Sequence, residues 1–140
     1  MHTLVQQLFD LTPRTVRSAR DFATRALDSW GGCDRRDDIE TCVSELAGNA
    51  VKHAAGPGTG YLVRLTRHER CVHLEVQDGR GGRAPWMRPL TGGEVGGRGL
   101  RIVQELSDDW GVDSYGADGK AVWTCFRRSG EPTPGCSYAS

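Results

Sequence analysis

SELAGNAVKHA, residues 44–54, combines the most regular apolar pattern of the chain with its first group of chemically useful polar side chains. Apolar residues recur there at spacings of three and four, and the pattern predicts an amphipathic helix over residues 34–54. Glu45 and Asn49 are four residues apart, so they stack on one flank of the apolar stripe. A carboxylate and a carboxamide at the edge of a buried face are suited to line a cleft as a general base and a metal ligand.

The same flank has a plainer interpretation. Lys52 and His53 lie beside Glu45 and Asn49, and the four side chains also form an ordinary solvated helix edge with an i,i+4 polar pair. Taken alone, the helix favours this plainer interpretation. The functional one depends on what the rest of the chain brings to the flank.

The elements around this helix predict the fold. An earlier helical pattern has Thr12 as its N-cap and Pro13 as its first residue, and Gly31-Gly32 ends it. The expected elements are helices at 12–31 and 34–54, strands at 61–67 and 71–78 joined by 68–70, a helix from about 100, strands at 110–115 and 120–128, and an edge strand within 3–11. This order indicates an α/β (α+β) two-layer sandwich, with a mixed, mainly antiparallel sheet covered on one face by three helices.

Length and composition restrict the classes of function. The chain has 140 residues, which suits one domain over 1–128, and we expect the Gly-, Pro- and Ser-rich residues 129–140 to be a disordered tail. Basic and acidic residues number 18 each, which argues against direct nucleic-acid binding. Neither a membrane-span pattern nor a signal-peptide pattern is visible, so we expect a cytoplasmic protein. The five cysteines contain no CxxC pair and predict neither a disulfide framework nor a zinc site, and we expect His68 and His73 to be surface residues of a hairpin.

A second candidate group ends the strand at 71–78. Asp78 has the same parity as Leu74 and Val76, so it points towards the helices at the end of the strand. A carboxylate there requires a donor, and an adenine amino group is a suitable one. An Asp-Gly turn opener that caps its own backbone explains the residue equally well.

The third group is Gly96-Gly97-Arg98-Gly99-Leu100, where a glycine-rich loop over 79–99 enters a helix. Glycines leave backbone N–H groups open to an anion, and the helix N-terminus adds partial positive charge. Residues 79–101 carry five arginines against one acid, a balance that suits a polyphosphate. A plain disordered linker is the alternative interpretation. The P-loop pattern GxxxxGK[ST] is absent, which disfavours the P-loop folds.

In their order along the chain, SELAGNAVKHA (44–54), VQDGRGG (76–82) and GGRGLRIVQELSDDWGV (96–112) resemble the N, G1 and G2 boxes of the Bergerat-fold (GHKL, histidine-kinase-like) ATPases. Within that superfamily the chain is similar to the short stand-alone bacterial anti-sigma factors that are also serine-protein kinases. RSARDFATRALDSWG (17–31) resembles the opening helix of that branch. The likeness covers nearly all of residues 3–128, and three ordered boxes are far more specific than one glycine motif. It therefore favours the functional interpretation of each group.

The resemblance implies a role for each candidate residue. Glu45 matches the general base, and Asn49 matches the Mg²⁺ ligand that holds the phosphates of ATP. Asp78 matches the carboxylate that accepts from the adenine amino group, and Lys52 and His53 would line the pocket. The remaining matches are Gly82 in the G1 box and Gly97, Arg98, Gly99 and Leu100 in the G2 turn beneath the phosphates.

The resemblance also implies a function. The chain would bind Mg·ATP, sequester a sigma factor of RNA polymerase and phosphorylate a serine of a small anti-sigma antagonist protein, and the branch suggests a homodimer. One departure is Arg80, which puts a bulky side chain into the G1 box where the backbone should pass close to the base. Two alternatives stay open. One is a nucleotide-binding adaptor without phosphotransfer, favoured if Arg80 weakens the adenine pocket, and the other is an ATP hydrolase in which Glu45 activates water.

Overall fold

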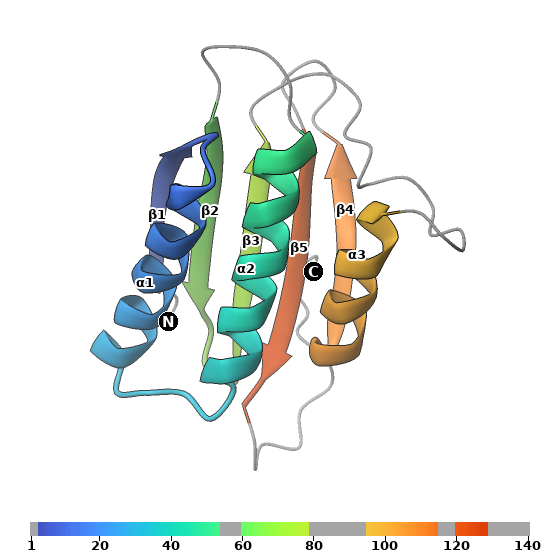
Figure 1. Ribbon diagram of the computed structural model, residues 1–140. Helices are drawn as coiled ribbons and strands as arrows, with labels where there is room; N and C mark the ends of the chain where they lie inside the picture. The colour runs from blue at the N-terminus through green and yellow to red at the C-terminus, as the bar shows by residue number, and fades with distance from the viewer. Residues whose placement is uncertain (1–2, 54–59, 79–94, 115–119, 129–140) are drawn as a thin grey trace.

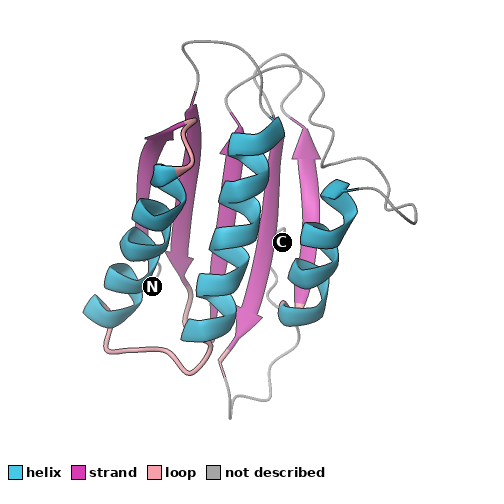
Figure 2. Ribbon diagram, viewed as in Figure 1, coloured by secondary structure: helices cyan, strands magenta, loops and turns pink. Residues whose placement is uncertain are grey.

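The computed structural model describes residues 3–53, 60–78, 95–114 and 120–128, which form a two-layer α+β sandwich (Figure 1). Three helices lie on one face of a single sheet, as Figure 2 shows by colour. In chain order the elements are β1 (Thr3–Asp10), α1 (Arg14–Ser29), α2 (Arg36–His53), β2 (Gly60–Arg67), β3 (Cys71–Asp78), α3 (Val95–Leu106), β4 (Asp109–Ser114) and β5 (Lys120–Arg127). The expected sandwich is confirmed. None of the described helices is long and apolar enough to cross a lipid bilayer.

The five strands form one sheet in the order β1-β2-β3-β5-β4, and each described ladder is antiparallel. Both expected hairpins are present, and the described ladders contain no parallel pair. Because β5 lies between β3 and β4, the chain passes from β3 through α3 to the edge strand β4 before it returns to the middle of the sheet. This crossover places α3 against α2, so α2 is the central helix of the layer (Figure 1).

The sequence predicts how α1 begins and how it ends. Pro13 already has helical backbone angles, with φ −57° and ψ −32°, but no side chain caps the helix. Pro13 thus stands at the start of the helix as expected, and the carbonyl oxygen of Thr12 accepts hydrogen bonds from the amide and the hydroxyl of Thr15. The expected glycine stop is confirmed. Gly31 and Gly32 have φ values of +96° and +91°, a left-handed conformation that favours glycine.

The apolar core lies between the helix layer and the inner face of the sheet. The helical and strand periodicities point the same residues inward, so the two layers bury each other without a buried polar residue on the apolar stripe of α2. Its principal members are Ala23, Leu27, Leu46, Ala50, Val63, Leu65, Leu74, Val76, Val122 and Phe126.

The outer face of the sheet differs from the expectation. His73, expected at the surface, is completely buried, and Glu75 on the same face is 1% exposed. The His73 ring stacks on Trp123 with centroids 5.9 Å apart, and Glu75 forms an ion pair with Arg64 at 3.5 Å. Burial, followed by the positive charges of His68 and Arg64, lowers the pKa of His73 to about 4, so its imidazole is neutral at pH 7. Alternation identifies the face of a residue but not whether that face is covered.

One cysteine also differs from the expectation. Cys33, Cys42 and Cys71 are free, whereas Cys125 is disulfide-bonded and its partner is not among the described residues. A bridge requires two sulfurs that the fold brings together, which spacing along the chain does not reveal. Burial raises the pKa of the Cys42 thiol to about 12, so this thiol stays protonated.

Candidate functional site

The two flanks of α2 face different helices. Arg20 of α1 donates to the Ser44 hydroxyl at 3.4 Å, which marks the flank towards α1. On the other side Arg35, the residue before α2, binds the Asp38 carboxylate at 3.1 Å and donates to the carbonyl oxygen of Leu106 at 2.7 Å. Leu106 is the last residue of α3, so Asp38 lies on the flank that faces α3.

Glu45 and Asn49 lie on this same flank. They follow Asp38 by seven and eleven residues, which correspond to two and three helical turns. Cys42 lies between Asp38 and Glu45 along the helix. Burial raises the pKa of its thiol most, and the carboxylates of Asp38 and Glu45 raise it further, which agrees with their lying on the same side of α2. Both Glu45 and Asn49 are half-buried. The crossover that brings α3 beside α2 therefore gives this polar pair a neighbouring helix.

Asn49 carries an unsatisfied buried group. Its Nδ2 atom is buried and has no hydrogen-bond partner in the part of the chain that the structure describes. Leaving such a donor unpaired costs about 1–3 kcal/mol, and buried polar groups in native proteins are nearly always paired. An orphaned carboxamide on a flank between two helices is therefore suited to bind a ligand, with Nδ2 as a donor and Oδ1 as an acceptor or metal ligand.

Three elements converge at the end of the molecule where Asn49 lies. α2 ends at His53, β3 ends at Asp78 and α3 begins at Val95, all at the upper end in Figure 1. Asp78 is opposite Tyr61 of β2 and Lys120 of β5 in the sheet register. The fold thus brings together the three sequence boxes that lie far apart along the chain. The end of α2, the end of β3 and the glycine-rich start of α3 all lie towards the same end of the sheet.

The other residues predicted for the site take varied positions. Lys52 is exposed near the end of α2, whereas the side chains of His53 and Asp78 are outside the described part of the structure. Gly82 and Arg80 belong to residues 79–94, which also lie outside it, so neither is placed.

The helix after the glycine-rich segment begins earlier than the sequence predicts, at Val95 instead of about residue 100. α3 starts at Val95, so Gly97, Arg98 and Gly99 form its first turns instead of a preceding loop. Leu100 is only 2% exposed and packs in the core, which means that its side chain anchors the helix. The backbone of these turns is the part that can face an anion, because the amides of a first helical turn have no partner within the helix.

Arg35 is a positioning residue that sequence reasoning missed. Besides Asp38 and Leu106, its guanidinium donates to the Asp108 carboxylate at 2.7 Å and to the carbonyl oxygen of Arg127 at 2.9 Å. These contacts join the start of α2, the end of α3 and the end of β5. The partners lie 71 to 92 residues away along the chain, so no local pattern signals them.

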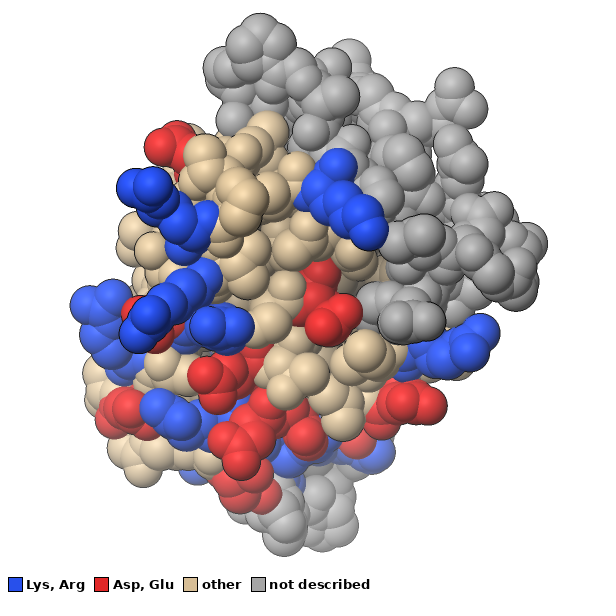
Figure 3. Space-filling view, viewed as in Figure 1, with Lys and Arg blue, Asp and Glu red and all other residues tan. Residues whose placement is uncertain are grey.

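The charges on the helix face are unevenly distributed. In Figure 3 most acidic side chains gather over the lower part of this face, where α2 begins, and basic ones lie along the side over α1 and also at other places, the upper part among them. Asp37 and Asp38 lie in the first turn of α2, where negative charge stabilises a helix. Much of the acidic charge therefore lies away from the end that carries Asn49, an arrangement that favours an anionic ligand at that end.

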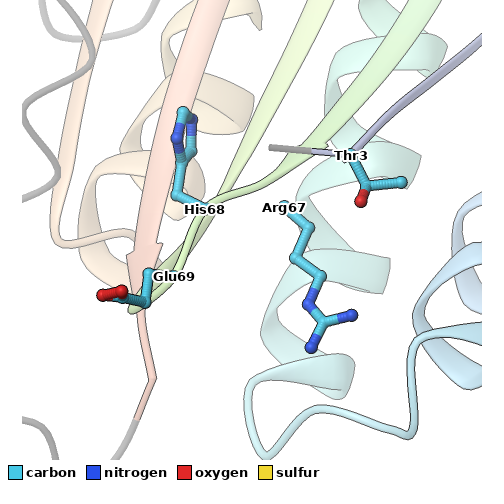
Figure 4. A pocket seen from close by; sticks show the side chains of 4 residues that line it. All are labelled: Thr3, Arg67, His68 and Glu69. Carbon is cyan, nitrogen blue, oxygen red and sulfur yellow. The ribbon is translucent and has the colours of Figure 1, made fainter. Parts of the chain in front are cut away.

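A cavity at the other end of the sheet is unconnected with these residues. It has a volume of about 270 Å³ and lies where β1 begins and β2 ends (Figure 4). Thr3, Arg67, His68 and Glu69 line it. Its lining holds none of the candidate residues, and it does not change the assignment of the site to α2, β3 and α3.

The donor set at Asn49 fits Mg²⁺ bound together with phosphates. Among the described residues no group of three or more His, Cys, Asp or Glu could hold a metal ion. Mg²⁺ is commonly held by one or two protein oxygens, with water and substrate phosphates completing its coordination. One carboxamide oxygen, on the flank of α2 that faces α3, is compatible with that requirement.

Comparisons with known proteins agree with this arrangement. A family model described as a histidine kinase-like ATPase domain matches residues 9–126. Among solved structures, the chain is similar to the histidine kinase domain of the blue-light activated histidine kinase from Erythrobacter litoralis EL346, with a TM-score of 0.53 and 20% sequence identity. The match covers 81% of this chain and 61% of that chain, and at this identity it shows the fold alone. No curated protein matches the chain.

Proposed function

Because the chain belongs to the family of histidine kinase-like ATPase domains, we propose that it binds Mg·ATP and transfers its γ-phosphoryl group to a serine of a partner protein. Membership of the family implies ATP binding. The observation that carries the assignment of the site is the buried, unpaired Nδ2 of Asn49, one helical turn from Glu45 on the flank that faces α3. The finer proposal of an anti-sigma regulator is supported by the likeness of the chain to that branch, which includes RSARDFATRALDSWG over residues 17–31.

In this proposal the nucleotide is held by groups from all three elements. Asn49 holds Mg²⁺ through its carboxamide oxygen, and its Nδ2 donor faces the phosphates. The first-turn backbone amides of α3, that of Gly97 among them, and the guanidinium of Arg98 bind phosphate oxygens, and Gly99 and Leu100 continue the turn beneath the phosphates. Asp78 accepts from the adenine amino group, which selects adenine over guanine.

Glu45 has a different task from Asn49. Bound Mg·ATP supplies the phosphoryl group, and phosphoryl transfer requires mainly positioning and neutralisation of charge. Glu45 accepts the proton of the attacking serine hydroxyl as a general base. Glu45 lies one turn further from the end of α2 than Asn49, and the proposal assigns it to the transfer step and Asn49 to nucleotide binding.

The proposed partners are a sigma factor of RNA polymerase and a small anti-sigma antagonist that carries the serine, which places the function in the cytoplasm. Arg80 in the G1 box supports a second candidate, a nucleotide-binding adaptor without transfer. An ATP hydrolase in which Glu45 activates water is the third. The measurements below distinguish the three.

Two substitutions on one helix test the division of roles. We expect Asn49→Ala to lose nucleotide binding and every activity that depends on it. We expect Glu45→Ala to bind ATP as the unchanged chain does, while transfer to the serine falls by about 10²–10⁴-fold, as for loss of a general base. ATP affinity is measured by titration with Mg²⁺ present, and transfer with labelled ATP and purified candidate antagonists. Release of inorganic phosphate without an antagonist identifies a hydrolase.

Ser44→Ala is the matched control, because Ser44 lies on the α1 flank of the same helix. It should retain binding and transfer, and melting curves of all three variants check that the fold is intact. Asp78→Asn should weaken ATP binding and narrow the preference for ATP over GTP. The proposal is wrong if Asn49→Ala binds ATP normally. The division of roles is wrong if Glu45→Ala loses binding as fully as Asn49→Ala.

A further inference from the structure

Cys71 of β3 and Cys125 of β5 lie against each other on the outer face of the sheet. In the register of the two strands Cys71 is opposite Arg127 and Cys125 is opposite His73, so the two cysteines are diagonal neighbours. Both have the parity of His73, which places them on the face away from the helices. Their Sγ atoms are 3.9 Å apart. The sheet therefore holds two sulfurs in contact.

The two sulfurs differ in chemical state. Cys125 is disulfide-bonded to a partner outside the described residues, and Cys136 is the one cysteine that the chain has there. Cys71 is a free thiol. Thiol–disulfide exchange begins with such a pair, because it proceeds by attack of one thiolate on a sulfur of an existing disulfide.

The surroundings hold this pair together and keep the other described thiols away. Cys125 is completely buried, Cys71 is 8% exposed, and the Trp123 side chain packs against the pair. The eight residues of β3 pair with the eight of β5 in one register, so the strands that carry the sulfurs are fixed relative to each other. Cys33 and Cys42 pack with the core on the opposite side of the sheet, which separates them from Cys125 while the fold is intact.

Only a short distance separates the contact from a covalent bond. An S–S bond is about 2.0 Å long, so the sulfurs of Cys71 and Cys125 must approach by about 1.9 Å. Diagonal neighbours are farther apart than directly opposite ones, so closure draws the two strands slightly together. Cys71 is the first residue of β3, and Arg127 opposite it is the last of β5. Such an adjustment costs less at a strand end than in the middle of a sheet.

The Cys71 thiol is held in its less reactive form. Burial, and after it the Asp108 carboxylate, raises the pKa of this thiol. The thiolate is the attacking species, so a thiol that stays protonated exchanges slowly. This explains how a free thiol and a disulfide coexist in contact.

From this contact we propose that Cys71 and Cys125 form a thiol–disulfide exchange site, in which Cys71 replaces the present partner of Cys125. Cys71 loses its proton, and its Sγ forms a bond to the Cys125 Sγ while the existing S–S bond of Cys125 breaks. The departing sulfur, which the proposal assigns to Cys136, leaves as a thiolate and takes up a proton. One disulfide and one thiol are present before and after the step, so it consumes no oxidant or reductant. The new bridge joins β3 to β5 within the sheet. The proposal does not depend on ATP binding.

Trypsin places the three cysteines on separate peptides, so mass spectrometry identifies each bridge. The peptides are CVHLEVQDGR with Cys71, AVWTCFR with Cys125 and SGEPTPGCSYAS with Cys136. The folded chain is equilibrated in a glutathione redox buffer, quenched with acid and alkylated before digestion. We expect Cys125 to be bridged to Cys136 in one fraction and to Cys71 in another. The bridge to Cys71 should exceed any bridge to Cys33 or Cys42 by about tenfold or more, because sulfurs held in contact react as if at very high concentration.

Two variants isolate the step. Cys136→Ser removes the departing sulfur, so oxidised glutathione should produce the bridge between Cys71 and Cys125 as the main product. Cys71→Ser should leave the bridge between Cys125 and Cys136 alone. Cys42→Ser is the matched control, because Cys42 is buried on the opposite side of the sheet, and it should retain both bridges. Melting curves check that each variant is folded.

Three results would overturn the proposal. The first is the absence of a bridge between Cys71 and Cys125 from both the unchanged chain and Cys136→Ser. The second is a bridge from Cys125 to Cys33 or Cys42 that forms as readily as the bridge to Cys71. The third is a bridge between Cys71 and Cys125 that forms only in urea, since the exchange would then depend on unfolding and not on the contact in the sheet.

Discussion

Arg35→Met tests whether the contacts that join α2, α3 and β5 stabilise the fold. The substitution keeps most of the aliphatic length and removes the guanidinium, which binds the carboxylates of Asp38 and Asp108 and the carbonyl oxygens of Leu106 and Arg127. The Arg35 side chain is 18% exposed, so these contacts are partly shielded from water. The guanidinium also lies over the Phe126 ring, 5.5 Å from its centroid.

The size of the effect follows from these contacts. A hydrogen bond from a charged group contributes about 1.5–3 kcal/mol, but such contributions do not add when they share one donor group. Asp108 keeps two other donors, the Arg127 amide and guanidinium, so its charge is not orphaned. We therefore expect Arg35→Met to reduce the free energy of unfolding by about 3 kcal/mol. For a domain of this size that lowers Tm by roughly 10 °C.

Arg36 provides a matched control at the next position. It pairs with Asp28 at 3.1 Å, but the two side chains are 40% and 56% exposed. Exposed pairs contribute little to stability because water screens them, so Arg36→Met should lower Tm much less than Arg35→Met does. Thermal and urea unfolding of both variants measure the difference. If Arg35→Met costs no more than Arg36→Met, the network does not stabilise the fold and the reasoning is refuted.

The same network gives the experiment a pH dependence. Burial alone would raise the pKa of Asp108, but the Arg127 amide and the Arg35 guanidinium outweigh it and hold the pKa below its usual 3.8. A carboxyl whose pKa is depressed by folding stabilises the native state above its unfolded pKa, and the stabilisation is lost as the pH falls through the folded value. The difference in the free energy of unfolding between the unchanged chain and Arg35→Met should therefore be constant from pH 5 to 7. This difference should become smaller below about pH 4.

Two further predictions concern buried positions. Burial lowers the pKa of His73 from 6.5 to about 4, so between these pH values the unfolded chain binds a proton that the folded chain does not bind. The free energy of unfolding should therefore fall by up to about 3 kcal/mol from pH 6.5 to pH 4. The urea midpoint of His73→Gln should fall less over the same range. A Cβ at Gly111 would lie 2.6 Å from the Trp123 ring, whereas one at Gly48 in α2 meets nothing within 4 Å. Gly111→Ala should therefore lower Tm, and Gly48→Ala should stabilise the protein by about 0.5–1 kcal/mol; equal effects of one sign would contradict the packing argument.

The fold could be predicted well because local sequence patterns indicate most of its helices and strands. The helix expected over 34–54 is α2 at Arg36–His53, and the strand expected over 71–78 is β3 at Cys71–Asp78. These agreements arise where apolar periodicity, capping glycines and hairpin length all indicate the same element. The edge strand within 3–11 is also present, although its Gln pair weakens the alternation.

What could not be predicted depends on contacts between distant segments. The alternation in β3 assigns His73 to the outer face, and there it is buried against Trp123 on another strand. Arg35 looks like any charged residue before a helix, because its partners at Leu106 and Arg127 become neighbours only through the sheet order. The start of α3 at Val95 was missed for a related reason. Three glycines predict a loop by propensity, and packing of Leu100 overrides that preference.

For the candidate site, the local motif and the topology contribute different things. The spacing of Glu45 and Asn49 places both on one flank of a helix in any fold, but only the crossover through α3 gives that flank a partner. α3 runs antiparallel to α2, so the guanidinium of Arg35 binds its carbonyl end at Leu106 while its glycine-rich amide end points towards the end of the molecule where α2 ends (Figure 1). A positive group at the carbonyl end neutralises that end of the helix dipole within the protein. The partial positive charge of the amide end is then the part of α3 that a phosphate can use, and Arg35 fixes where that end lies.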